Sequence, residues 1–126
     1  MRIVTLLMAA GCITSVLSTP APALDLARAF AHCTGRYSAL MEHQWLIRDP
    51  ASRDTEQRRK RFADLIEAVV APGQGAALMA MRIEAKMAQA ALLFARDFSQ
   101  DQALRHAAAR ASEAEIAACE MLLLQG

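Results

Sequence analysis

The sequence has few aromatic residues, glycines, prolines and cysteines, and no excess of charge of either sign. Aromatic residues make up 5% of its 126 residues, and the formal net charge is +1. Few aromatic residues argue against stacking platforms for bases, and a balanced charge provides no long-range attraction for nucleic acid. Hydrophobic residues make up 55% of the chain. That fraction argues against intrinsic disorder, and the length suits one domain with a single core.

The first 23 residues have the composition of a secretory signal peptide. Arg2 and the α-amine provide a positive start, an apolar segment follows over residues 3–17, and residues 21–23 (Ala-Pro-Ala) place small side chains where signal peptidase cleaves. We therefore expect residues 1–23 to be a signal peptide. Residues 24–126 are expected to form one helical bundle domain, exported to the periplasm or secreted.

Two alternatives to this cleavage remain open. An uncleaved anchor needs about 20 apolar residues, and here Pro20 and Pro22 follow a shorter segment. We expect no stable membrane span after signal cleavage. The small residues before Cys12 resemble a lipobox, where a bacterial lipoprotein is cleaved and lipidated, although the apolar segment continues beyond this cysteine.

The remaining chain favours helix over sheet. Alanine is far more frequent there than valine, isoleucine and threonine together, and Pro50 and Pro72 lie where periodic patterns stop. Apolar residues recur at helical spacing in four segments. These predict helices over about residues 25–47, 54–71, 76–98 and 100–124.

The first predicted helix has an apolar stripe and a polar one. The apolar stripe is Leu26, Phe30, Cys33, Tyr37 and Leu40, widened by Met41 and Trp45. The polar stripe is Asp25, Arg28, His32, Arg36 and His43. Gly35 lies inside this helix at a cost of about 1 kcal/mol relative to alanine, which indicates either close approach of another backbone or a kink.

The third predicted helix has two apolar stripes, so we expect it to be broadly buried. One stripe is Leu78, Met81, Ala85, Ala88 and Leu92, and the other is Met79, Ile83, Met87 and Phe94. Ser99 and Gln102 match a capping box that begins the fourth helix. Because no glycine or proline separates Phe98 from Gln102, one long rod through both segments is the alternative.

Short connections between four helices predict an up-down-up-down four-helix bundle. In that fold the first and fourth helices are antiparallel neighbours. Cys33 and Cys119, the only cysteines after residue 23, then lie at similar heights from one end of the bundle. We therefore expect a disulfide between them, which suits an oxidising compartment.

Other chemistry is weakly supported. His32 and His43 are too far apart along one helix to share a metal, and His106 is on another helix, so all three are expected at the surface. No C-x-x-C-H haem motif and no C-x-x-C redox pair occurs. The methionines are expected to fill the core, with a copper site at Met79 and Met87 as the alternative, because soft sulfur favours Cu(I).

The basic run Arg58–Arg61 spreads around the helix axis, so we expect a solvated helix start instead of one basic face. Glu67, Glu84 and Glu115 lie on three different helices and would permit acid–base chemistry only if two of them met in a pocket. We expect no catalytic residues and no cofactor. The sequence favours a non-catalytic binding module whose partner is another protein or an anionic surface, with a small-ligand or copper carrier as the alternative.

Overall fold

The computed structural model describes residues 21–125, and their side chains from residue 25 onward. Over that range the chain is all-helical. The four helices are α1 (Ala21–Leu46), α2 (Ser52–Val69), α3 (Gly75–Phe98) and α4 (Gln102–Leu124). Residues 1–20, with most of the predicted signal peptide and the lipobox cysteine, lie outside the described residues. Each predicted helix is present, with small shifts at the ends.

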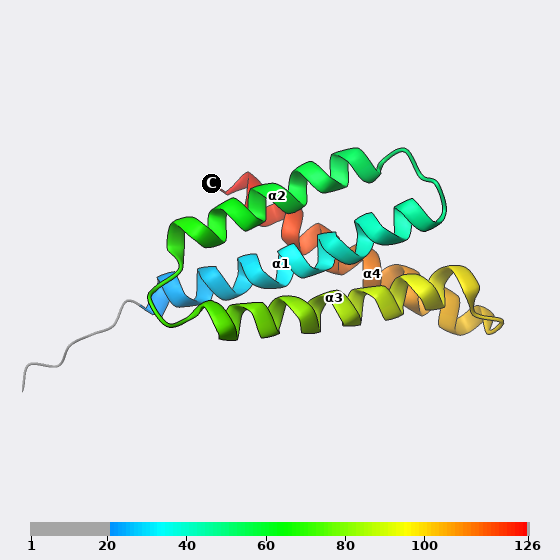
Figure 1. The fold of residues 1–126 in the computed structure, drawn as a ribbon. Helices are drawn as coiled ribbons and strands as arrows, with labels where there is room; N and C mark the ends of the chain where they lie inside the picture. Colours follow the sequence, from blue (N-terminus) through cyan, green and yellow to red (C-terminus); the bar gives the residue numbers. More distant parts are fainter. Residues whose placement is uncertain (1–20, 126) are drawn as a thin grey trace, which may run out of the picture.

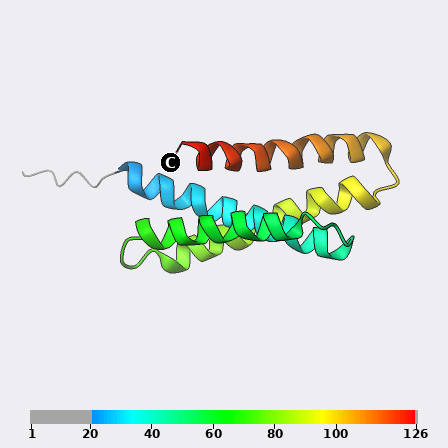
Figure 2. The same cartoon turned by 90° about the horizontal axis from the view of Figure 1, so that it is seen from above.

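The helices are arranged around α1. Figure 1 shows α1 between α2 and α3, and Figure 2 shows α4 along the side opposite α2. The backbone of α1 approaches all three other helices, α3 also approaches α4, and α2 approaches α1 alone. The first helix is therefore buried around much of its circumference, which explains why its burial extends beyond the predicted apolar stripe.

The larger part of the core lies where α1, α2 and α4 meet. Its buried residues are Phe30, Cys33, Tyr37, Phe62 and Cys119. The ring of Phe62 lies 5.7 Å from that of Tyr37 and 6.1 Å from that of Phe30. Three of these five residues belong to the predicted apolar stripe of the first helix, whereas Leu26 and Trp45 of that pattern are exposed. Aromatic burial of this kind dominates the stability of a small core.

The two cysteines meet inside this core. Cys33 and Cys119 form a disulfide with their Cα atoms 5.6 Å apart, across 86 positions of sequence. The structure thus brings together the pair that the sequence predicted to bond. Their burial places the bond out of reach of solvent.

The contact between α1 and α3 depends on small residues. Ala27 and Ala31 are fully buried and pack with Leu78. A Cβ atom on Gly35 would overlap the carbonyl oxygen of Arg82 and lie 2.9 Å from the backbone nitrogen of Lys86. Of the two roles predicted for this glycine, the structure shows the close approach of a second backbone.

The prediction that α3 is broadly buried is wrong. The face with Leu78 and Ala85 is buried, and it also includes Gln89 and Leu93. The second stripe is exposed: 51% for Met79, 55% for Ile83, 65% for Met87 and 63% for Phe94. The physical reason is that α3 packs on α1 and α4 with one side only, and no described helix covers the other.

The turn between α3 and α4 breaks the chain, so the alternative of one long rod is wrong. The predicted cap is also wrong, because Asp101, not Ser99, caps α4. Asp101 has an extended backbone, and its carboxylate accepts a hydrogen bond from the Leu104 N–H at 3.2 Å. The Ser99 hydroxyl instead accepts from the Asp101 N–H within the turn. An aspartate two residues closer to the helix satisfies the free amide more directly.

Candidate functional site

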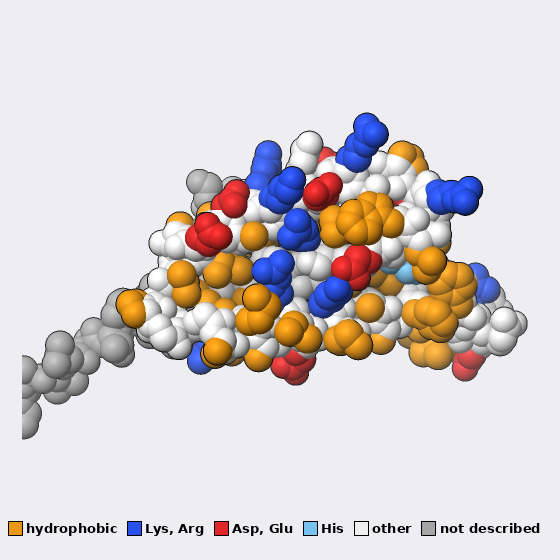
Figure 3. All heavy atoms as spheres, viewed as in Figure 1, with side chains coloured by type: hydrophobic (Ala, Val, Ile, Leu, Met, Phe, Trp, Pro, Cys, Tyr) orange, Lys and Arg blue, Asp and Glu red, His pale blue; other side chains and the backbone are white. Residues whose placement is uncertain are grey.

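The uncovered side of α3 is the most distinctive surface of the molecule. We call it the outer face of α3 and define it by Met79, Ile83, Met87, Phe94 and Phe98. Figure 3 shows a row of apolar side chains along α3 and a larger group where α1 and α3 end. The spaces between the large side chains along this face are filled by alanines, including Ala80 and Ala91. It is therefore a long apolar strip with alternating large and small residues.

The end of α1 also carries exposed apolar side chains. Trp45 and Leu46 are 55% and 68% exposed, and Ile47 follows them. On α3, the rings of Phe94 and Phe98 lie 5.0 Å apart. Exposed apolar side chains occur singly on any protein, whereas several large ones lie at the ends of α1 and α3 here.

His43 lies directly below this group and is buried, so its predicted place at the surface is wrong. Its Nε2 lies 2.5 Å from a carboxylate oxygen of Asp97, and its ring lies 6.0 Å from that of Phe98. Arg96 donates two hydrogen bonds to the same carboxylate. These contacts fasten the end of α1 to the end of α3.

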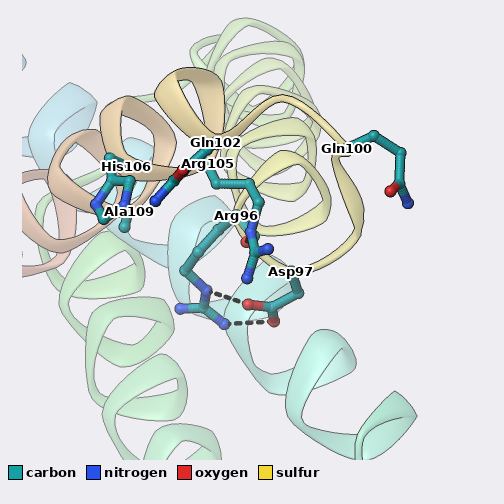
Figure 4. Close-up of a pocket in the computed structure, with 7 residues that line it drawn as sticks. All are labelled: Arg96, Asp97, Gln100, Gln102, Arg105, His106 and Ala109. Carbon is teal, nitrogen blue, oxygen red and sulfur yellow. Dashed lines mark hydrogen bonds and ion pairs between the residues drawn. The ribbon is translucent and has the colours of Figure 1, made fainter.

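A wide cavity of about 530 Å³ lies at the turn between α3 and α4 (Figure 4). The Arg96–Asp97 pair forms one wall, and Arg105 reaches across to the backbone carbonyl of Arg96. The Arg96 hydrogen bonds, helped by His43, lower the pKa of Asp97 to about 2. A carboxylate with so low a pKa is a poor general base at neutral pH. His106 also lines this cavity.

A smaller cavity, about 180 Å³, lies between α1, α3 and α4. Two of the three glutamates singled out in the sequence, Glu84 and Glu115, line it together with His32. Glu115 is paired with Arg36, which also approaches the Sγ of Cys119 at 3.7 Å. The carboxylate of Glu115 is thus held in an ion pair that ties α4 to α1. Glu67 does not line this cavity.

Buried Gln89 lines the same cavity, and periodicity alone did not reveal its role. Its amide donates to the Ser112 hydroxyl at 2.9 Å, joining α3 to α4, while its Oε1 has no partner among the described residues. Its position between Ala85 and Leu93, each four residues away on the buried side, is the signal that could have placed it inside.

A third cavity, about 330 Å³, is a cleft between α1, α2 and α3. Its lining includes Met79 together with Arg59, Arg82 and Lys86. The basic run that contains Arg59 does not form one basic face. Arg58 pairs with Asp54 and Glu120, and Lys60 pairs with Glu56, whereas Arg59 turns toward this cleft.

Met79 and Met87, the residues of the copper alternative, do not meet at one site. The two residues share the outer face of α3, but they are separated by about 12 Å of axial rise, with Ile83 between them. Of these two methionines, Met79 lines the cleft described above and Met87 does not. Within residues 21–125, no group of three or more His, Cys, Asp or Glu side chains is arranged to hold a metal ion.

Comparison with family models, curated proteins and solved structures produced no match for this chain. No described helix combines the length and the apolar character that crossing a membrane requires. The surfaces and cavities of the described residues are therefore the basis for inferring a function.

Proposed function

We propose that this protein is an exported, non-catalytic binding module that docks a helix of another protein on the outer face of α3. In this proposal residues 1–23 are a signal peptide, and residues 24–126 form an up-down-up-down bundle in the periplasm or outside the cell. A buried disulfide is compatible with an oxidising compartment, and the first 23 residues have the composition of a signal.

The observation that carries the docking proposal is the exposure of the outer face of α3. Its five large side chains and the adjoining Trp45, Leu46 and Ile47 are each at least two-fifths exposed. One aromatic side chain can bury about 150–250 Å², so the face offers on the order of several hundred Å², comparable to one side of a standard interface. Free monomers rarely expose so much contiguous apolar surface without using it.

The shape of the face favours a helix as the occupant. From Met79 to Phe98 the strip runs along one side of a single helix for about 28 Å, the length of a helix of about 19 residues. Alternating large and alanine positions form ridges and grooves into which a second helix packs. The outward strip between Met79 and Phe94 has no charged side chain at its centre, so an apolar helix face matches it better than a charged surface does.

Site-specific photo-crosslinking in the native host tests this proposal. A photoreactive side chain at Met87 should crosslink one protein through an amphipathic helix, whereas the same group at Met121, 60% exposed on α4, should not. Mass spectrometry should show that the copy of this protein in the crosslinked product begins at Leu24. A product with twice the mass of residues 24–126 would identify a second copy of the chain as the occupant. A lack of crosslinks at Met87, or identical crosslinks from both positions, contradicts docking on α3.

A second candidate function, a small-ligand carrier, is favoured by one observation. The cleft between α1, α2 and α3 has a volume of about 330 Å³, within the lower range of small-molecule sites, and polar groups from all three helices converge on it. The predicted role of Met79 in a carrier suits this cleft, whereas Met87 lies outside it. The cleft therefore favours an organic ligand over copper.

A further inference from the structure

The cleft between α1, α2 and α3 combines positive charge with an apolar floor. It is lined by Ser38, Met41, Glu42, Arg59, Met79, Arg82, Ile83 and Lys86. Three cationic groups face one carboxylate there, although the whole chain has a net charge of only +1. The cleft is thus a local concentration of positive charge on an otherwise balanced molecule, and an anion is the ligand that it favours.

Pairing within the cleft leaves its two arginines without a carboxylate. Lys86 lies 2.6 Å from Glu42, so these two charges satisfy each other. Arg59 and Arg82 make no ion pair with any residue of the range 21–125. The Nε of Arg59 is buried and has no acceptor among those residues. A buried donor without an acceptor is costly, and a carboxylate satisfies a guanidinium with two parallel hydrogen bonds.

The apolar residues that line the cleft indicate the chemistry of the uncharged part of the ligand. Met41 is buried in the floor, and half-exposed Met79 and Ile83 form the α3 side. Methionine side chains adapt to varied apolar shapes. An alkyl chain lying against these three residues would remove their exposed surface from water, while its charged end stays at the arginines.

We propose that this cleft binds a small amphipathic carboxylate, whose carboxylate pairs with Arg59 and Arg82 and whose alkyl chain lies over Met41, Met79 and Ile83. The inference rests on the carrier function. Met79 and Ile83 belong to both the cleft and the outer face of α3, but Met87 lies outside the cleft, whereas Arg59 and Arg82 line it. Crosslinking at Met87 therefore tests docking, and ligand binding that depends on the two arginines tests the cleft.

Titration of the folded protein with dodecanoate, below its micellar concentration, tests the proposal. Trp45, the only tryptophan of the chain, lies one helical turn beyond Met41 but outside the cleft, so its fluorescence is a secondary readout beside calorimetry. We expect saturable binding of one dodecanoate per chain, confirmed by calorimetry. Dodecyltrimethylammonium and dodecyl maltoside should bind at least about tenfold more weakly, because neither offers an acceptor of the right charge.

Matched double variants locate the site. Arg59→Gln/Arg82→Gln should weaken dodecanoate binding at least about tenfold, whereas Arg61→Gln/Arg110→Gln, which removes the same charge from exposed positions, should leave it nearly unchanged. Arg59→Lys/Arg82→Lys, a milder change if the first variant does not fold, should weaken binding by an intermediate factor because it keeps charge but loses the bidentate geometry. Absence of saturable binding, equal binding of the neutral amphiphile, or equal loss in both glutamine variants would overturn the proposal.

Discussion

At the scale of single residues, Gly35 determines how closely α1 and α3 approach. Gly35→Ala should destabilise the fold by about 2 kcal/mol, because the added methyl meets Arg82 and Lys86 backbone atoms, and this outweighs the better helix propensity of alanine. Urea unfolding measures the change. Gly75→Ala is the matched control, since nothing lies within 4 Å of its added Cβ. Equal stability of the two variants would show that the close approach is absent.

Asp97, also at the scale of single residues, makes a pH-dependent contribution to the stability of the fold. Its pKa of about 2 in the folded state lies below the ordinary value of 3.8, because Arg96 and His43 stabilise the carboxylate. The stabilisation is therefore complete above about pH 4 and is lost as the pH falls toward 2. Because Asp97 is partly exposed, we expect its carboxylate to add about 1 kcal/mol to the unfolding free energy, less than the pKa shift alone would imply.

Asp97→Asn tests this contribution. The difference in unfolding free energy between the original protein and the variant should be about 1 kcal/mol at neutral pH and should shrink between pH 4 and pH 2. Other carboxylates titrate in both proteins and cancel in the difference. A difference that stays constant over this pH range would contradict the assigned role.

The sequence predicted the position of a single residue correctly where helical periodicity and the length of the helix determine that position. Cys33 and Cys119 could be paired because helix length converts sequence position into height along a bundle. His43 and Gln89 could not be placed, because periodicity assigns a residue to a face but does not say which neighbour covers that face. Asp97 and Ser112, their partners, lie on other helices.

At the scale of helices, α4 depends on the disulfide for its attachment to α1. Its first half packs on α3 through the Gln89–Ser112 contact, whereas its second half meets α1 around Cys119 and the Arg36–Glu115 ion pair. An ion pair this exposed contributes little, about 0–1 kcal/mol. Ile116, Leu122 and Leu123 also pack against the core, and the disulfide adds a covalent link between this half of α4 and α1.

Reduction of the Cys33–Cys119 bond should loosen α4 selectively. We expect faster amide hydrogen exchange after Ser112, with α1 and α3 less affected, and a loss of unfolding free energy on the order of 4 kcal/mol from the long closed loop. Cys33→Ser/Cys119→Ser should reproduce the exchange pattern without a reductant. Uniform exchange throughout the chain, or no change, would contradict a local fastening.

The buried and exposed faces of the helices illustrate what a sequence can and cannot specify about an element. Each segment predicted from apolar spacing is helical, but the apolar stripe of Met79, Ile83, Met87 and Phe94 faces solvent. Hydrophobicity shows that a face avoids water, and a face that binds a partner has the same pattern as one that joins the core. Only the arrangement of the neighbouring helices distinguishes the two.

At the scale of the whole molecule, a central α1 explains both the core and the exposed surface. Because α2 packs on α1, and α4 packs on α1 and on the inner side of α3, none of the described helices covers the outer face of α3 (Figures 1 and 3). The sequence favoured a binding module and assigned Trp45 to the apolar stripe of the first helix. It could not reveal the longer α3 strip, because the expected bundle would have buried it.

The most direct test of docking on α3 is a comparison of two exposed methionines in purified protein. The affinity for the partner captured at position 87 should fall at least about tenfold with Met87→Lys and stay within about twofold with Met121→Lys, while circular dichroism shows both variants folded. If Met87→Lys binds that partner as tightly as the original protein, the outer face of α3 is not the docking surface.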